Sequence, residues 1–264
     1  MGHVIIENLT KEFVNRRRIK RKPGDPDQPG EVLRVLDEVN LEFKDGEMVC
    51  VLGASGCGKS SMLRIIAGFD QATSGRVLID SNEVKGPSSD HIFVFQHNGL
   101  LPWMTVWQNV ELGVRNMASE AEKRDMVFEF LDMVELTGFE NHYPNQLSGG
   151  MQRRAELARA LVVNPDMLFM DEPFTGLDYL TQLRIREEVV NIHSYIGKTM
   201  IMVTHFIEDA VIMADRIIVM GDRPTKVKAE YEMHFDRPRN LETNKELAEI
   251  RDDIFLKLGV SYAV

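Results

Sequence analysis

The stretch from Gly53 to Ser60 reads GASGCGKS and contains residue types that can hold phosphate groups. It follows the apolar run 48–52, which has the length of a strand, and precedes apolar residues at helical spacing in 61–67. Glycines let successive backbone N–H groups point at phosphate oxygens, and the helix start adds a partial positive charge. Lys59 would reach the β and γ phosphates, and the hydroxyl of Ser60 would bind Mg²⁺. The sequence therefore predicts a nucleotide site built from a strand, a loop and a helix.

Two adjacent carboxylates, Asp171 and Glu172, follow a second apolar run at 167–170. Open α/β sheets bind their ligands at the carboxyl ends of their strands. Because neighbouring residues on a strand point in opposite directions, we expect the two carboxylates to have different roles. Asp171 suits the Mg²⁺ shell, and Glu172 could polarise an attacking water molecule. An acidic turn without chemistry is the alternative, and the presence of Lys59 in the same chain disfavours it.

A third stretch, residues 147–152, reads LSGGMQ and precedes a helical pattern at 153–161. Ser148, Gly149 and Gly150 would offer a hydroxyl and accessible backbone N–H groups at the start of that helix, which is a favourable place for an anion. The chain therefore contains two candidate phosphate-binding helix starts.

The composition of the 264 residues is that of a globular protein, with 44% hydrophobic and 27% charged residues. The net charge of -10 argues against non-specific binding along nucleic acid, which needs a broad basic surface. Cys50 and Cys57 fall in the predicted strand and its loop, where neither suits a disulfide, and this favours a reducing compartment. No window of 18 apolar residues exists, and the first residues lack the features of a signal peptide. We therefore expect a cytoplasmic location and no nucleic-acid partner.

The elements that must position these residues follow from hydrophobic periodicity. Short apolar runs predict strands in the front half of the chain, and the dipeptides DG, SG and SN between them suit hairpin turns. These strands are 4–9, 40–43, 48–52, 77–79 and 92–95. They predict a mixed sheet beside the phosphate loop. The following pattern is helical, with predicted helices at 118–136 and 150–163.

After residue 164 strands alternate with helices, which predicts a parallel sheet covered on both faces. The strands are 167–170, 200–203 and 217–220, and the helices are 179–195 and 206–214. The remaining residues begin polar and extended and end in an amphipathic helix, a stretch too short for an independent domain. We therefore expect a single α/β domain with a P-loop NTPase core. Its parts would be the core at 1–104 and 164–222, an inserted helical subdomain at 105–163 and a C-terminal appendage at 223–264.

Three further features allow two interpretations each. Phe13, at the exit of the first strand, could be a platform for a base or a core or edge residue. The basic run in 16–22 could contact anionic lipid or a partner, or it could belong to a solvated hairpin insertion. The apolar stretch 100–107, with Trp103 and Trp107, could dock the helical subdomain onto the sheet or form a groove for a partner helix.

Taken together, the three motifs resemble those of the ATP-binding subunits of ABC transporters. GxxxxGK[ST], LSGG before a helix and MDEP at a strand end occur in the family's order, and the resemblance spans residues 4–221. It implies binding of ATP and Mg²⁺, ATP hydrolysis and coupling to a membrane permease, and it favours the partner groove for 100–107. It also implies a head-to-tail homodimer or paired cassette with two shared ATP sites, in which LSGG of one subunit faces the γ-phosphate bound by the other.

The resemblance implies roles for four residues that the motifs alone leave open. Gln96 matches the glutamine that contacts Mg²⁺ or water and faces the membrane subunit, and His205 matches the histidine that contacts the γ-phosphate. Asp178 matches the loop that crosses to the other subunit, and Phe13 matches the aromatic residue that stacks on adenine. The catalytic candidates are therefore Glu172, His205 and Gln96, and the Mg²⁺ candidates are Ser60, Gln96 and Asp171. The nucleotide-binding candidates are Phe13, Gly53, Ala54, Ser55, Gly56, Cys57, Gly58, Lys59, Ser60, Ser61, Ser148, Gly149, Gly150 and Asp178.

Three longer stretches resemble the nitrate, sulfonate and taurine import branch of the family: LLPWMTVWQNV, YPNQLSGGMQRR and DRP at 222–224. They imply import of a small anionic or organic solute through a separate permease that docks near 96–107, with a solute-binding protein as an indirect partner. They also imply a peripheral location on the inner face of the cell membrane. The solute is not encoded here, because selectivity would lie in the permease and the binding protein.

Some positions depart from the family pattern. Met151 stands where many members have Gln, and Thr175 and Gly176 stand where Ser and Ala are frequent. The backbone donors and Ser148 remain, so we expect phosphate contact to survive these changes. Two other functions fit less well. A soluble ABC ATPase acting on nucleic acid or ribosomes usually has two cassettes or a long coiled-coil insertion, and a regulator without catalysis would not need the complete set of motif residues.

Overall fold

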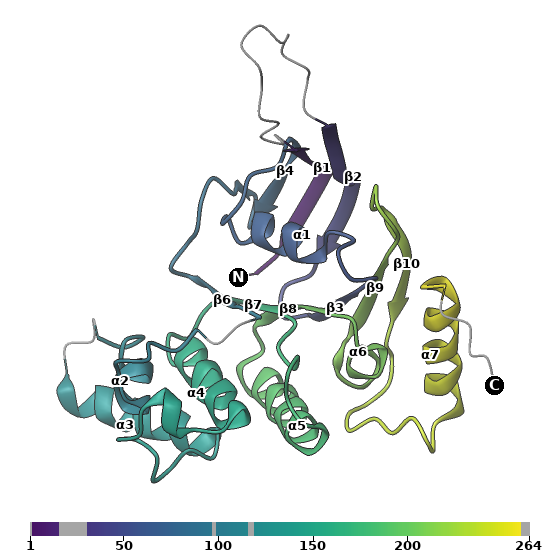
Figure 1. The fold of residues 1–264 in the computed structure, drawn as a ribbon. Coiled ribbons are helices and arrows are strands. Elements are labelled where there is room, and N and C mark those ends of the chain that lie inside the picture. The colour runs from purple at the N-terminus through teal and green to yellow at the C-terminus, as the bar shows by residue number, and fades with distance from the viewer. Residues whose placement is uncertain (1, 16–30, 97–98, 116–118, 260–264) are drawn as a thin grey trace, which may run out of the picture.

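The computed structural model describes residues 2–15, 31–96, 99–115 and 119–259, whose strands form two sheets (Figure 1). The smaller sheet contains β1 (Val4–Asn15), β2 (Glu31–Phe43), β4 (Ser74–Ile79) and β5 (Asn82–Glu83). The larger sheet contains β3 (Met48–Leu52), β6 (His91–Val94), β7 (Met167–Asp171), β8 (Thr199–Thr204), β9 (Arg216–Met220) and β10 (Val227–Glu232). Their orders are β2-β1-β4-β5 and β10-β9-β3-β8-β7-β6. In the larger sheet β9, β3, β8, β7 and β6 pair in parallel, as the strand and helix alternation predicted.

Helices cover both faces of the larger sheet (Figure 1). The helices are α1 (Lys59–Ile66), α2 (Val106–Glu111), α3 (Glu120–Met133), α4 (Gly149–Leu161), α5 (Tyr179–Ile196), α6 (Ile207–Met213) and α7 (Lys245–Lys257). α1 lies between the two sheets, whereas α5 and α6 lie on the opposite face of the larger sheet. None of the helices in the described ranges is long and apolar enough to cross a membrane.

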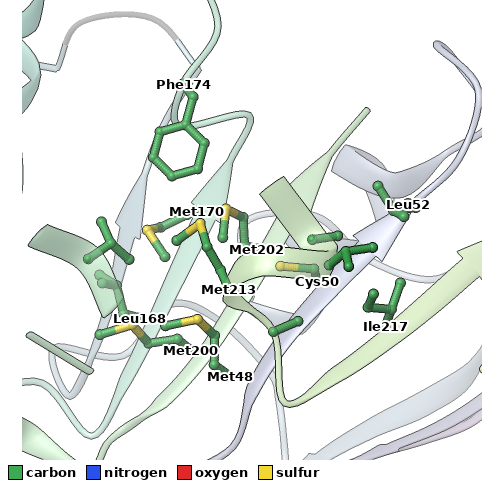
Figure 2. Close-up of a cluster of buried hydrophobic side chains, with 14 of the residues drawn as sticks. Met48, Cys50, Leu52, Leu168, Met170, Phe174, Met200, Met202, Met213 and Ile217 are labelled. Carbon is green, nitrogen blue, oxygen red and sulfur yellow. The ribbon is translucent and has the colours of Figure 1, made fainter. Parts of the chain in front are cut away.

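Successive residues of the central strands point to opposite faces and therefore enter two separate hydrophobic clusters. Met48 and Cys50 of β3 pack with α5 and α6 in the first cluster, whereas Val49 and Val51 pack around α1 in the second. Figure 2 shows the first cluster, in which methionines from three strands and from α6 gather near Cys50. Thioether side chains are flexible and fill irregular space in a core. Both faces of β3 are thus buried, which holds the start of the phosphate loop in place.

The front half differs from the sequence prediction in its turns and strand lengths. The DG dipeptide at 45–46 does not close a hairpin, because it links β2 of the smaller sheet to β3 of the larger one. The SG dipeptide at 74–75 lies inside β4 and is not a turn. Only the SN dipeptide belongs to a hairpin, where Asp80 and Ser81 have φ values of 48° and 68° and join β4 to β5.

β1 and β2 are longer than the runs 4–9 and 40–43 that predicted them, because they pair as one antiparallel ribbon. Phe13 therefore lies within β1, opposite Leu33, and not beyond the end of the strand. The basic run in 16–22 falls outside the described residues.

α2, α3 and α4 form a group of helices beyond β6, the edge strand of the larger sheet (Figure 1). They share a third cluster of buried side chains, which is drawn from residues 100–162. Thr105 caps α2 with a capping box to Gln108, and Ser119 caps α3. The division of the chain into a core, a helical subdomain and an appendage stays a prediction.

The residues described after β9 include β10 and α7, of which β10 was not predicted as a strand. Its residues alternate between half-buried and exposed, as in an edge strand with one solvated face. Arg239 fastens the segment between them to α6, because its buried guanidinium donates to the carbonyl groups of Val211, Ala214 and Met233. Burial lowers the pKa of Arg239 to about 10.

Candidate active site

The phosphate loop leaves β3 and enters α1 through backbone conformations that favour glycine. Gly56 and Gly58 have φ values of 76° and 122°. A Cβ on Gly58 would lie 2.7 Å from Cγ1 of Val35, so a side chain there would also clash with β2. The Lys59 side chain is buried, and its Nζ donates to the carbonyl oxygens of Gly53 at 2.7 Å and of Ala54 at 3.0 Å. The ammonium group is therefore held against the loop.

Ser60 and Asp171 meet beside this loop, although 111 residues separate them in the sequence. The hydroxyl of Ser60 donates to Oδ1 of Asp171 at 2.7 Å. Asp171 is buried at the end of β7, and burial raises its pKa. Its Oδ2 has no hydrogen-bond partner, and the nearest cation is Nη2 of Arg64 at 3.9 Å. A hydroxyl beside a carboxylate oxygen without a donor fits Mg²⁺, which binds proteins through one or two carboxylates and otherwise through water and substrate phosphates.

Glu172 is the centre of a group of polar side chains that follow three adjacent strands. Nε2 of Gln96, which follows β6, donates to its Oε2 at 3.1 Å. Nδ1 of His205, which follows β8, lies 3.3 Å from its Oε1. Thr175 donates to Oε2 at 3.0 Å. Because β6, β7 and β8 are parallel neighbours, their carboxyl ends bring the three catalytic candidates together at one edge of the sheet.

The backbone of Glu172 is held in an unusual conformation. Its φ is 48°, which non-glycine residues adopt only where the surroundings enforce it. Its N–H donates to the carbonyl of Val203 in β8 at 2.8 Å. Asp171 and Glu172 thus direct their carboxylates to different partners. Glu172 lies beyond the end of β7 and has a positive φ, so strand alternation is not the cause, and the different roles of the two residues stay a prediction.

The segments that begin α4 and α5 lie side by side. Ser148 caps α4 by accepting from the N–H of Met151 at 3.3 Å. Asp178 caps α5 by accepting from the N–H of Thr181 at 3.1 Å and from its hydroxyl at 2.6 Å, and these hydrogen bonds hold the pKa of Asp178 below its usual range. A Cβ on Gly150 would lie 2.3 Å from Cγ2 of Thr181. Gly150 therefore allows the close approach of the two helices.

The two predicted phosphate-binding helix starts lie in different parts of the molecule. α1 lies between the sheets, whereas α4 belongs to the helical group beyond β6 (Figure 1). No hydrogen bond within the described ranges joins Ser148 to Lys59. Phe13 is half-exposed in the smaller sheet, with Nζ of Lys11 5.1 Å from its ring centroid. A role of its ring as a base platform stays a prediction.

Comparison with known proteins decides the family. Residues 36–175 match the profile described as ABC transporter. The chain belongs to this family. The nitrate import ATP-binding protein of Synechocystis sp. is 38% identical over 256 residues, which are 97% of this ABC ATPase and 91% of that relative. The taurine import ATP-binding protein of Pelagibacter ubique is 42% identical over 207 residues, which are 78% of each chain.

Solved structures agree with this ABC ATPase in fold. A dimeric ABC transporter cassette matches it with a TM-score of 0.73 and 36% identity, over 88% of this chain and 100% of the other. A dimeric post-hydrolysis cassette bound to ADP and Pi matches with the same TM-score and coverage, at 35% identity. The predicted P-loop NTPase fold, the ATP-binding cassette and its ATP hydrolase activity are thus confirmed.

The ABC ATPase has contacts beside the candidate site that the sequence motifs did not indicate. Arg153, in the first turns of α4, is buried and donates to the carbonyls of Phe95 at 2.8 Å and Pro173 at 2.7 Å. It therefore ties α4 to the segments that carry Gln96 and Glu172. Its spacing by four from the core residues Leu157 and Leu161 was the available signal, because that spacing places it on the buried face. No local signal pointed to the contact of Thr175 with Glu172.

Some residues of the apolar stretch 100–107 of the ABC ATPase pack inside the helical group, and others are exposed where a partner could bind. Leu100 is buried in the cluster of helices α2 to α4. Trp107 packs on Phe128, with ring centroids 4.8 Å apart. Trp103, in contrast, is 69% exposed. Part of the stretch thus holds the helical group together, whereas Pro102 and Trp103 are exposed on the surface.

Proposed function

We propose that this chain is the ATP-hydrolysing subunit of an importer for a small anionic or organic solute of the nitrate, sulfonate or taurine type. The observation that carries the hydrolytic role is the position of Glu172, which lies beside Asp171 and contacts both Gln96 and His205. The import role is supported by the relatives whose names assign them to nitrate and taurine import.

In the proposed mechanism, the residues of the site bind the phosphates, hold Mg²⁺ and activate water. Lys59 binds the β and γ phosphates of ATP as a point charge. Ser60 and Asp171 would hold Mg²⁺, which would supply positive charge beside the phosphate oxygens. Glu172 accepts a proton from the attacking water. The side chains that contact its carboxylate keep this group in a fixed orientation. Gln96 and His205 position that carboxylate, and His205 also contacts the γ-phosphate.

The second candidate phosphate-binding segment acts in trans. Ser148, Gly149 and Gly150 contact the γ-phosphate held by a second subunit, and Asp178 crosses the same interface. Two observations support this arrangement. Ser148 and Asp178 are exposed at neighbouring helix starts, and two of the matching solved cassettes are dimers. The functional unit is therefore a homodimer or paired cassette.

A permease docks near Gln96, beside an aromatic surface. Phe69, Phe93 and Phe95 form a cluster with ring centroids 4.5 to 5.7 Å apart. A cavity of about 380 Å³ adjoins these rings and is closed on its other side by α4 and the end of α2. Exposed aromatic side chains in a hollow suit an apolar partner helix. The chain is accordingly a peripheral subunit on the inner face of the cell membrane.

The replacement Glu172→Gln tests the hydrolytic role. The variant should bind MgATP but hydrolyse it at least ~100-fold more slowly, which is the usual contribution of a general base. Steady-state phosphate release measures the loss, and Glu208→Gln, at an exposed position on α6, is the matched control. Near-normal turnover by Glu172→Gln would overturn the assignment.

Co-purification tests the import role. The chain should be recovered from detergent-solubilised membranes with a permease, and vesicles that contain both should take up nitrate, a sulfonate or taurine when ATP is supplied. Glu172→Gln vesicles should show no uptake. Recovery with nucleic acid or ribosomes and without a permease would contradict the proposal.

A further inference from the structure

The end of β9 and the segment that follows it run along the phosphate loop and approach it at three points. A Cβ on Gly53 would lie 3.2 Å from Cβ of Met220. A Cβ on Gly56 would lie 3.6 Å from Nη2 of Arg223. The hydroxyl of Thr225 donates to the carbonyl oxygen of Cys57. Arg223 therefore lies against the exposed part of a loop that binds phosphate.

Thr225 holds this segment between the phosphate loop and β2. It is fully buried, its N–H donates to the carbonyl of Val35 at 2.9 Å, and its carbonyl accepts from the N–H of Asp37 at 3.1 Å. Arg223 is only two residues away from this anchor, so its backbone is fixed beside the loop. An exposed side chain on a fixed backbone can reach a ligand without any movement of the fold.

Arg223 is exposed and has no carboxylate partner among the residues that the structure describes. Lys226 in the same segment differs, because its Nζ lies 3.1 Å from Oδ2 of Asp37. A guanidinium matches the geometry of phosphate oxygens and is always charged, so it suits an anionic ligand at the loop.

The order of the larger sheet indicates which end of a nucleotide Arg223 would meet. β3, which leads into the loop, lies between β9 on one side and β8 and β7 on the other. Asp171 and Glu172 follow β7 and His205 follows β8, so the γ-phosphate end belongs on that side. Arg223 follows β9 and lies on the opposite side, next to β2, whose partner strand carries Phe13. It is therefore placed toward the base, away from the γ-phosphate.

We propose that Arg223 is a further nucleotide-binding residue that contacts the α-phosphate. This inference rests on the proposed binding of nucleotide at the phosphate loop. ATP and ADP share the α-phosphate, so both should depend on Arg223 to the same degree. A residue that contacted only the γ-phosphate would affect ATP alone.

Equilibrium titration of the full chain with MgATP and with MgADP tests the proposal. Arg223→Ala should weaken both affinities by roughly fivefold to tenfold, the scale of a charge-assisted hydrogen bond near a surface. Arg223→Lys should retain most of the affinity, because the charge remains. Lys226→Ala, from the same segment, should bind both nucleotides like the unchanged chain. The affinity of Arg223→Ala for ADP should also fall less steeply with added salt.

Three results would overturn the proposal: unchanged affinity of Arg223→Ala, a loss confined to ATP, or an equal loss in Lys226→Ala. Thermal unfolding without nucleotide verifies that each variant is folded. Lys59→Ala separates this proposal from the one on which it rests. If Lys59→Ala binds MgATP as tightly as the unchanged chain, the phosphate loop is not the site and the proposed function fails. If Lys59→Ala loses affinity and Arg223→Ala does not, only the role of Arg223 fails.

Discussion

The carboxylate of Glu188 on α5 is partly buried, and few contacts offset its loss of hydration. Burial raises its pKa from 4.5 to about 7. Nη1 of Arg154 is 3.9 Å from its Oε1 but lies closer, at 3.1 Å, to Oε2 of Glu135. The other oxygen of Glu188 has no hydrogen-bond partner. Ionisation of this side chain near neutral pH therefore opposes folding.

The replacement Glu188→Gln should stabilise the protein in a pH-dependent way. Because the pKa of the folded state lies above that of the unfolded chain, the free energy of unfolding falls as the pH rises from 4.5 to about 7. Glutamine does not ionise. The difference in the free energy of unfolding between the variant and the unchanged protein should therefore increase from pH 5 to pH 8, by at most about 3 kcal/mol. Urea unfolding at the two pH values measures the gain.

Glu187→Gln provides the control for this experiment, because Glu187 is the exposed neighbour on the same helix. Its stability relative to the unchanged protein should be the same at both pH values. An equally pH-independent difference for Glu188→Gln would show that the Glu188 carboxylate does not titrate as its burial implies.

At the scale of elements, the approach of α4 to α5 depends on one glycine. The first two residues of α4 are both glycine, but their surroundings differ. A Cβ on Gly150 would lie 2.3 Å from Cγ2 of Thr181, whereas a Cβ on Gly149 would find its nearest neighbour, Cδ2 of Leu177, at 4.0 Å. Gly150 is thus a packing residue as well as a candidate for phosphate contact.

The pair Gly150→Ala and Gly149→Ala tests this difference in stability. Gly150→Ala should lower the free energy of unfolding by about 1 to 3 kcal/mol, the usual effect of overpacking. Gly149→Ala should be close to neutral, because alanine favours a helix and space is available. Denaturant unfolding of both variants measures the effect. Equal stability of the two variants would argue against close helix packing at this site.

At the scale of the whole molecule, α1 and α4 lie apart, so the two candidate phosphate-binding helix starts would meet only between the two subunits of a dimer. If LSGG completes a site on another chain, Lys59→Ala and Ser148→Arg should each inactivate a homodimer. A mixed dimer of the two variants would then contain one site with both lesions and one with neither. Mixing should restore a single-turnover burst of ATP hydrolysis in the intact site, which rapid quench measures.

The alternative arrangement makes the opposite prediction for mixed dimers. If each chain completes its own site, every site carries one lesion, and mixing restores nothing. The absence of a burst, with mixed dimers shown to form by differential tagging, would therefore refute the shared sites.

We expect the exposed side chain of Trp103 to contact the permease. Trp103→Ala should weaken assembly with the permease by roughly 2 kcal/mol or more, as expected for an exposed aromatic residue at an interface. The affinity of the isolated subunit for ATP should not change, since Trp103 is 69% exposed and outside the nucleotide site. Tyr195→Ala, which removes an exposed aromatic residue from the end of α5, is the control. Unchanged assembly of Trp103→Ala would show that Trp103 does not contact the permease.

The sequence by itself determined the phosphate loop, the central strands and the chemical types in the site. These features are local. GASGCGKS prescribes its own conformation through its glycines, and the runs 48–52, 167–170 and 200–203 are apolar on both faces because the strands are buried on both faces. The parallel order then brings Glu172 and His205 to one edge of the sheet.

Tertiary structure alone decided which distant residues support that edge. Arg153 reaches the segments beside Gln96 and Glu172 only because α4 packs against them, and Arg223 reaches Gly56 only because Thr225 is anchored to β2. The prediction of a hairpin at 45–46 was wrong because strand pairing also depends on the tertiary structure. A turn dipeptide specifies a local bend, but the partner of each strand depends on how the whole chain buries its apolar surface.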